Sequence, residues 1–386
     1  MFFVARLIIG VGGVFLIVAG PCLVSELAYP THRTVVTALF GPSWYAGATL
    51  AAWISYGTSF MGESNSLAWR LPSALQAVLP FMQLIGTFFI PESPRYLVDA
   101  SREDDAKKVL MKYHGGNDPA NSLLVDMELD EIRTAIAHDK AVQEVGWRSF
   151  LRTKANRRRL FIVMWLAMTQ QLCGNGLVSY YLNLILNSIG ITSAKEQLVI
   201  NGGLMVYNVG TAVISGFIVG SIKRRPTFVI GLGTMLAIFT IWTALSAVNE
   251  ERNFEQKSLG QGVLAMIFLF YATYNLCLNA LPNLYISEVL PYHLRSKGTT
   301  TFALVGAVTN VYNGFVNPIA MGAISWRYYI VFCGLLLVEL IVITFVFPET
   351  YGYTLEEAAA AFGDGALVQN SHSGKTEDVE VSHIEK

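Results

Sequence analysis

A run of residues without a single charge, from Leu160 to Ala194, limits the folds open to this chain more than any other feature. An apolar segment of about 20 residues is long enough to cross a lipid bilayer as a helix. The sequence has nine such runs, at roughly 7–25, 35–60, 71–90, 160–188, 197–221, 227–248, 262–286, 300–323 and 328–347. We therefore predict an all-α membrane protein with about nine transmembrane helices.

The composition agrees with a membrane protein and argues against other classes. Only 14% of the 386 residues are charged, whereas soluble proteins average about 25%. The net charge of −1 gives no indication of a nucleic-acid partner, and we expect none. The cysteines are too scattered for a disulfide framework or a metal site; they are Cys22, Cys173, Cys277 and Cys333. We expect no metal and no cofactor.

Amides and glycines interrupt the uncharged run in its middle. Gln170, Gln171 and Asn175 each cost roughly 2–7 kcal/mol to bury without a partner. Gly174 and Gly176 loosen a helix at the same place. This pattern predicts a broken helix that lines a polar ligand cavity, as in transporters. The alternative is that the amides only bond to neighbouring helices within a bundle.

Basic residues gather in alternate loops. The loops 26–34, 92–159, 223–225 and 288–298 carry most of the loop arginines and lysines. The positive-inside rule places these loops, and with them the C-terminus, in the cytoplasm. We expect a multi-pass protein of the plasma membrane. The expected domains are a partial transmembrane bundle (1–91), a cytoplasmic helical linker (92–159), a six-helix transmembrane bundle (160–348) and a cytoplasmic tail (349–386).

The two halves of the chain repeat the same landmarks. Glu26 precedes Arg33 by seven residues, and Glu288 precedes Arg295 by the same spacing. Trp69-Arg70 leads to Pro91-Glu92 just as Trp326-Arg327 leads to Pro348-Glu349. Such duplication predicts two bundles with a site where they meet. Because the second half has six spans and the first has three, we expect a twelve-span design that lacks its first three spans, or a gene model with a wrong start.

These landmarks resemble those of the sugar porter family of the major facilitator superfamily. The matching motifs are Pro91-Glu92-Ser93-Pro94-Arg95, Pro348-Glu349-Thr350 with Gly352–Glu357, the two Glu-x6-Arg loops and Gln170-Gln171 with Tyr180-Tyr181. The sequence is most similar to fungal lactose permeases and cellodextrin transporters, as in Trp53, Ser55–Thr58 and Gly174–Tyr181. The resemblance implies the helical bundle of that superfamily, alternating access, and a sugar and protons as partners in a lipid bilayer.

The resemblance also implies which residues bind the sugar. They are Gln170, Gln171, Asn175, Asn208, Asn283 and Asn313. The family usually has an Asn at the position that Gly176 occupies here, so Asn175 lies one place before it. Asn283 stands where the family has a Trp that stacks on the sugar. For Asn208 and Asn313, hydrogen bonding between helices is the alternative.

Charged residues receive two roles from the same resemblance. Arg6 is similar to the arginine that serves proton coupling, although an Arg near a helix end also snorkels to the interface. A cytoplasmic gate of ion pairs is implied for Glu26, Arg33, Glu92, Arg95, Arg224, Arg225, Glu288, Arg295 and Glu349. The alternative for this set is solvated surface charge.

We therefore expect a transporter of a disaccharide, such as lactose or cellobiose, or of a hexose, working by proton symport. A sugar sensor that does not transport and an inactive truncated fragment are the alternatives. The sequence contains no nucleophile elbow, metal-ligand cluster or phosphate loop, which argues against an enzyme. We expect that the 386-residue chain by itself gives no proton-coupled sugar accumulation in vesicles.

Overall fold

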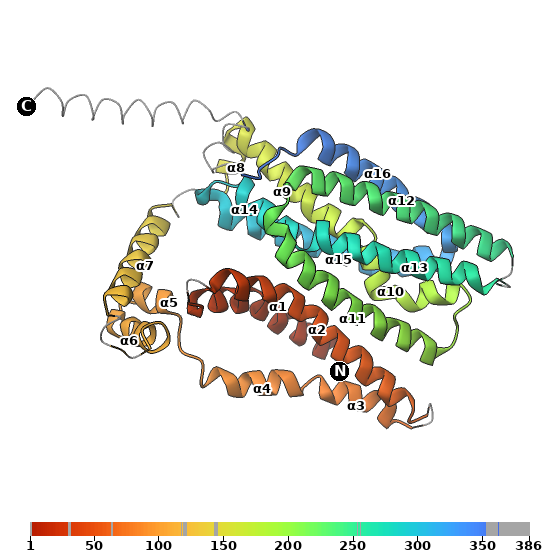
Figure 1. Cartoon of the computed structure of the whole chain (residues 1–386), viewed down its shortest axis with the longest axis horizontal. Coiled ribbons are helices and arrows are strands. Elements are labelled where there is room, and N and C mark those ends of the chain that lie inside the picture. The colour runs from red at the N-terminus through yellow and green to blue at the C-terminus, as the bar shows by residue number, and fades with distance from the viewer. Residues whose placement is uncertain are drawn as a thin grey trace, which may run out of the picture. The chain divides into compact units, whose positions relative to one another are not determined.

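A computed structural model describes residues 2–29, 32–62, 65–116, 118, 122–142, 146–252, 254, 256–352 and 362. Helices dominate the part of the chain that it describes, and they form two compact units, Met1–Glu144 and Val145–Lys386 (Figure 1). The first unit contains α1 (Phe2–Leu27), α2 (Arg33–Ser59), α3 (Leu67–Leu75), α4 (Val78–Thr87), α5 (Pro94–Asp99), α6 (Glu103–Tyr113) and α7 (Ser122–Val142).

The second unit is a bundle of long helices joined by short turns. It contains α8 (Ser149–Arg152), α9 (Lys154–Leu172), α10 (Asn175–Ser188), α11 (Ala194–Ile218), α12 (Arg224–Glu251), α13 (Lys257–Tyr274), α14 (Leu281–Val289), α15 (Tyr292–Ile324) and α16 (Tyr328–Val346). A π-turn, η3 (Asn275–Asn279), separates α13 from α14. Short 3-10 turns follow α11 (η2, Val219–Ser221) and α15 (η4, Ser325–Arg327).

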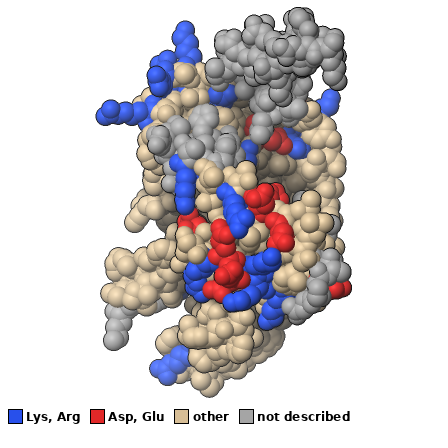
Figure 2. Space-filling model, turned by 90° about the vertical axis from the view of Figure 1, so that its left-hand side faces the viewer, with Lys and Arg blue, Asp and Glu red and all other residues tan. Residues whose placement is uncertain are grey.

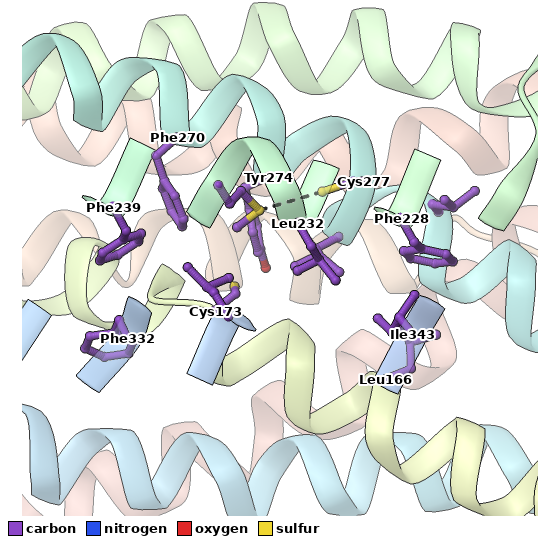
Figure 3. Close-up of a cluster of buried hydrophobic side chains, with 14 of the residues drawn as sticks. Leu166, Cys173, Phe228, Leu232, Phe239, Phe270, Tyr274, Cys277, Phe332 and Ile343 are labelled. Carbon is purple, nitrogen blue, oxygen red and sulfur yellow. Dashed lines mark hydrogen bonds between the residues drawn. The ribbon is translucent and has the colours of Figure 1, made fainter. Parts of the chain in front are cut away.

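Helix α12 packs against both α13 and α16. Its buried face supplies Phe228, Leu232, Phe239 and Trp242 to one continuous apolar core. Figure 3 shows these helices meeting through aromatic and aliphatic side chains from α9, α12, α13 and α16. The ring of Phe239 lies 4.9 Å from that of Trp242 in a stacked arrangement. This core is the rigid support on which the polar residues described below are held.

Six helical stretches of the described chain are long and apolar enough to cross a membrane. They are Phe3–Leu27, Lys154–Ser188, Ala194–Ser221, Arg224–Glu251, Ser258–Val289 and Leu294–Val346. The last contains both α15 and α16. The predicted spans 35–60 and 71–90 are not among the six. The second of these runs is divided into α3 and α4, because Pro80 has no N–H to donate to the carbonyl of Gln76.

The predicted break in the run 160–188 is confirmed. Helix α9 ends at Leu172 and α10 begins at Asn175. Between them Gly174 has a φ of +101°, in the left-handed region that side chains with a Cβ avoid. A Cβ at Gly174 would also lie 2.4 Å from Cζ of Phe239. Glycine is therefore required here both by the backbone and by the core behind it.

Helices α5, α6 and α7 form a small core of their own within the first unit. Leu97, Leu110 and Val125 are almost fully buried there. The ion pair between Lys107 Nζ and Asp126 Oδ1 (2.6 Å) joins α6 to α7. Acidic and basic side chains are interleaved on this face of the molecule (Figure 2). These helices are thus held together by a short apolar seam and by exposed ion pairs.

His114 connects this small core to the end of α1. Its side chain is only 3% exposed, and Nδ1 lies 2.7 Å from Oε2 of Glu128. Nε2 lies 3.3 Å from the carbonyl oxygen of Leu27. The ring also makes an edge contact with Tyr29 at a centroid distance of 5.6 Å. One buried side chain therefore bridges α6, α7 and the last residue of α1.

Replacing His114 with alanine should loosen the end of α1. The change removes both polar contacts of the ring and leaves Glu128 less satisfied, since its Oε1 is already buried without a partner among the described residues. Such a loss costs about 1–3 kcal/mol. Hydrogen exchange in residues 24–28, followed by mass spectrometry, should be faster in His114→Ala. The control is His32→Ala, which changes an exposed histidine, and equal exchange in the two variants would contradict the bridge.

Candidate functional site

Polar side chains from α9, α10 and α11 converge on one segment, Tyr274–Asn279, at the junction of α13 and α14. From α9, Gln170 Nε2 donates a hydrogen bond of 2.9 Å to the carbonyl oxygen of Leu278. From α10, Asn175 contacts Tyr274, and from α11, Asn208 contacts Asn275. Three of the predicted sugar ligands therefore surround the same break in a helix.

The break itself follows from Pro282. In a regular α-helix the carbonyl of Leu278 would accept a bond from the N–H of residue 282, but proline has none and its ring clashes with that carbonyl. The five residues of η3 widen the helix at this point. π-turns of this kind recur at functional sites. The amide of Gln170 supplies the hydrogen bond that the helix cannot make for Leu278.

A chain of buried amides holds η3 from the other side. Asn275 Nδ2 donates to Oδ1 of Asn208 (3.2 Å) and to Oγ1 of Thr211 (2.8 Å). Asn279 Nδ2 donates to Oδ1 of Asn275 (3.3 Å). Asn208 has no exposed surface, and its Nδ2 is without a partner among the described residues. This buried donor is costly unless another group accepts from it.

A polar strip runs along α10 and α13. Asn175 Nδ2 donates to the hydroxyl of Tyr274 (3.0 Å), and its Oδ1 accepts from Ser179 Oγ (3.0 Å). Ser179 Oγ in turn lies 2.8 Å from the hydroxyl of Tyr271. These groups offer donors and acceptors in a row on the side of α10 that faces α13.

Gln171 differs from its neighbour Gln170. Asn313 Nδ2, from α15, donates a bond of 2.7 Å to the backbone carbonyl of Gln171. The side-chain amide of Gln171 is half-buried and makes no hydrogen bond within the described part of the chain. A Cβ at Gly176 would lie 2.9 Å from Nδ2 of Asn313, so this glycine permits the approach of α15. The backbone of Gln171 is thus held by Asn313, while its side-chain amide has no hydrogen-bond partner among the described residues.

Two other predicted site residues make none of these hydrogen bonds. Asn283 is exposed in the first turn of α14, and Arg6 is exposed near the start of α1 in the first unit. Sequence reasoning missed Tyr274 and Asn275, which contact the predicted ligands directly. The signal available was the pair Asn275 and Asn279, one helical turn apart and just before Pro282, inside an apolar run.

Charged residues meet where α12, α14 and the end of α16 come together. Arg224 Nη2 lies 2.8 Å from Oε1 of Glu288, and Thr350 Oγ1 donates to Oε2 of the same carboxylate (2.6 Å). The Glu349 carboxylate accepts from the backbone N–H groups of Arg224 (2.9 Å) and Arg225 (3.2 Å), at the positive end of α12. We refer to Arg224, Glu288, Glu349 and Thr350 as the charge cluster.

Two further predicted gate residues of the second unit bond to backbone carbonyls nearby. Arg225 Nη2 donates to the carbonyl of Thr344 (2.6 Å), and Arg295 Nη2 donates to that of Ser287 (2.9 Å). These bonds tie the first turns of α12 and α15 to the ends of α16 and α14. Arg224, Arg225, Glu288, Arg295 and Glu349 therefore lie in one region, as a gate would require.

The first unit repeats one contact of the charge cluster. Ser93 Oγ donates to the carboxylate of Glu26, as Thr350 Oγ1 does to that of Glu288. The two hydroxyls follow Glu92 and Glu349 in the repeated Pro-Glu motifs. Glu92 is exposed and Arg95 is half-buried, while the side chain of Arg33 lies outside the described residues. The repeat in the sequence is thus matched by a repeat in hydrogen bonding.

Several known proteins of similar sequence are described as fungal transporters. The MFS-type transporter criB of Aspergillus cristatus is 28% identical over 372 residues, which are 96% of this chain and 75% of the relative. The high-affinity glucose transporter of Kluyveromyces lactis is 30% identical over 377 residues, covering 92% of this chain and 67% of the relative. The hexose transporter HXT8 of Saccharomyces cerevisiae is 28% identical and is covered over 65% of its length. This chain therefore spans about two thirds to three quarters of these relatives.

Solved structures show the fold to which these helices correspond. The inward open conformation of the xylose transporter XylE from E. coli matches with a TM-score of 0.70 at 20% identity, over 88% of this chain and 68% of that one. Its complex with 6-bromo-6-deoxy-D-glucose, described as a proton:xylose symporter of the major facilitator superfamily, matches with a TM-score of 0.66. The relatives and these structures are transporters rather than enzymes. Since the pattern of the family described as "Sugar (and other) transporter" matches residues 1–362, the chain belongs to that family of major facilitator transporters.

Proposed function

We propose that this protein carries a sugar across a membrane, and that Gln171 is its principal hydrogen-bonding ligand in the second unit. The observation that carries the proposal is the half-buried amide of Gln171, which has no hydrogen-bond partner within the described residues. Its neighbours Gln170, Asn175 and Asn313 are held by protein partners. A carboxamide offers both donors and an acceptor, which suits the hydroxyls of a sugar.

The physical mechanism requires binding and movement but no covalent chemistry. A hydroxyl-rich solute loses its water shell in the site, and the amides of the site replace those hydrogen bonds. Rocking of one bundle against the other then exposes the site to each side of the membrane in turn. The charge cluster closes one side, and we place that side, with the C-terminus, in the cytoplasm of a cell whose plasma membrane holds the protein.

The substrate we propose is a hexose or a disaccharide, and the coupling ion is the proton. Support for a hexose comes from the names of the relatives, which include glucose and hexose transporters. Support for protons comes from the structural neighbour that is described as a proton:xylose symporter. Arg6 is the residue of this chain that we assign to coupling, and Asn208, Asn283 and Asn313 complete the proposed sugar site.

Replacing Gln171 with alanine should weaken sugar binding by about 1–3 kcal/mol, because the sugar hydroxyls lose a buried partner. The measurement is equilibrium binding of labelled D-glucose and of labelled lactose to the purified chain in nanodiscs. A matched control is Gln261→Ala, which removes the same side chain from an exposed position on α13. Binding that is equally strong in both variants would remove Gln171 from the site.

Transport and sensing are separated by a second measurement on the same preparations. Exchange of labelled sugar across the membrane of proteoliposomes, with and without a pH gradient, is expected of a transporter. Binding without any exchange would favour the sensor. A rate that does not respond to the pH gradient or to a protonophore would show facilitated diffusion in place of symport.

A further inference from the structure

We propose that Gln170 is a positioning residue that transmits sugar occupancy to the charge cluster through the proline-broken segment η3–α14. The inference rests on the proposed function, since it assumes that a sugar binds beside Gln171. It assigns to Gln170 a role distinct from that of a simple ligand. The observation behind it is the bond from Gln170 Nε2 to Leu278 O, the carbonyl that Pro282 leaves without a helical donor.

Helix α14 is short, and side-chain hydrogen bonds hold the chain both just before it and in its last turn. Just before α14, in η3, the carbonyl of Leu278 that Pro282 leaves without a helical donor accepts a side-chain bond from Gln170. Six residues after Pro282, Glu288 is bonded to Arg224 and Thr350. Tyr285, between the two, donates to the carbonyl of Pro348 (2.9 Å). Any change in the direction of α14 at η3 must therefore strain the charge cluster.

Helix α15 contains a second proline whose missing N–H is compensated by a side chain from another helix. Pro318 leaves the carbonyl of Gly314 without its helical donor. The hydroxyl of Tyr181, from α10, donates to that carbonyl at 2.8 Å. Side chains of α9 and α10 thus satisfy the two carbonyls that prolines orphan in the helices opposite them. Of these two carbonyls, that of Leu278 lies next to a segment that carries a charge-cluster residue.

A bound sugar competes for the amide that holds η3. The amides of Gln170 and Gln171 point about 100° apart on α9, so the proposal requires that one sugar, bonded to Gln171 through one hydroxyl, reach Gln170 with another. When that amide turns toward the sugar, the carbonyl of Leu278 loses its donor, and a buried carbonyl without a partner is unfavourable. The segment then relaxes, α14 changes direction, and the pair Glu288–Arg224 opens. The bond between Asn275 and Asn208 remains and anchors the first residue of η3, so the movement is confined to the residues that follow it.

The test uses Pro282→Ala in the full chain, because this variant restores an N–H at position 282 for the carbonyl of Leu278. The readout is hydrogen exchange of residues 222–228, whose first amides are bonded by Glu349. In the unmodified chain, D-glucose should accelerate this exchange relative to L-glucose by about 5- to 150-fold, the usual range of coupling between two sites. In Pro282→Ala the sugar should still bind, but the acceleration should disappear.

Two further variants keep the result decisive. Gln170→Ala should accelerate the exchange without any sugar, and adding Pro282→Ala to it should restore slow exchange. Pro318→Ala, the matched control, removes a proline whose orphaned carbonyl is bonded by Tyr181, so the response to D-glucose should remain. If the unmodified chain binds no sugar in the assay, the proposed function fails. If sugar binds and accelerates exchange equally in Pro282→Ala, the relay through Gln170 is wrong. If Pro282→Ala does not fold, slow exchange in sugar-free Gln170→Ala overturns the relay.

Discussion

Gly174→Ala should strongly destabilise the second unit. The residue has a φ of +101°, where an L side chain costs roughly 1–2 kcal/mol. The added methyl would lie 2.4 Å from Cζ and 2.8 Å from Cε2 of Phe239, which is fully buried. Overpacking of a core adds about 1–3 kcal/mol. We expect a clear drop in the thermal unfolding temperature of the purified protein and weaker sugar binding, because Gln171 loses its fixed position.

Gly233→Ala provides the matched control for this prediction. Gly233 lies within α12 of the same unit, and a Cβ there meets no atom within 4 Å. Alanine in a helix interior is favoured over glycine by roughly 0.5–1 kcal/mol. The control should therefore unfold at the same temperature as the unmodified protein or slightly above it. Equal unfolding temperatures for Gly174→Ala and Gly233→Ala would contradict the structural role of the α9–α10 break.

Glu288→Gln should open the charge cluster. The side chain of Arg224 is only 6% exposed and is bonded to both oxygens of Glu288. Glutamine keeps the shape of glutamate but loses the charge, and hydrogen bonds to charged groups contribute about 1.5–3 kcal/mol. The state in which Arg224 is separated from residue 288 should gain population by roughly ten- to a hundredfold, since each 1.4 kcal/mol is a factor of ten. Trypsin should then cleave after Arg224 faster than in the unmodified protein.

The specificity of this result depends on where the charge is removed. Glu251 is an exposed carboxylate at the opposite end of α12, and exposed charges contribute only about 0–1 kcal/mol. Glu251→Gln should leave the rate of cleavage after Arg224 unchanged. Sugar binding by Gln171 should survive in both variants. If Glu288→Gln is as resistant to trypsin as Glu251→Gln, the cluster is surface charge and does not act as a gate.

The repeated contact of the two halves supports the gate hypothesis on physical grounds. A hydroxyl that follows the repeated Pro-Glu motif donates to the repeated Glu in each unit, from Ser93 to Glu26 and from Thr350 to Glu288. Each contact joins a residue that follows one helix to the last turn of another, from Ser93 after α4 to α1 and from Thr350 after α16 to α14. Because the two units share this bond, we expect Ser93→Ala and Thr350→Ala to loosen their own units in the same way.

The sequence by itself determined the membrane class, the break at Gly174 and the duplicated motifs. These follow from local rules, since run length, the absence of charge and the need for glycine at positive φ act within a few residues. Pro282 also marks a helix break in the sequence, but the donor that compensates for it comes from a distant helix. The run 71–90 shows that apolar length alone is not sufficient to predict a span, because Pro80 divides this run into α3 and α4.

Only the tertiary structure decided which amide of the pair Gln170-Gln171 is free. The acceptor of Gln170, Leu278 O, lies 108 residues further along the chain, and the donor to the Gln171 carbonyl lies 142 residues away. Adjacent residues on a helix point about 100° apart, so one amide meets η3 while the other does not. No pattern in the sequence specifies such partners, because they depend on how α9, α13 and α15 pack. The apolar sequence therefore set the helices, and their packing assigned the polar groups between them.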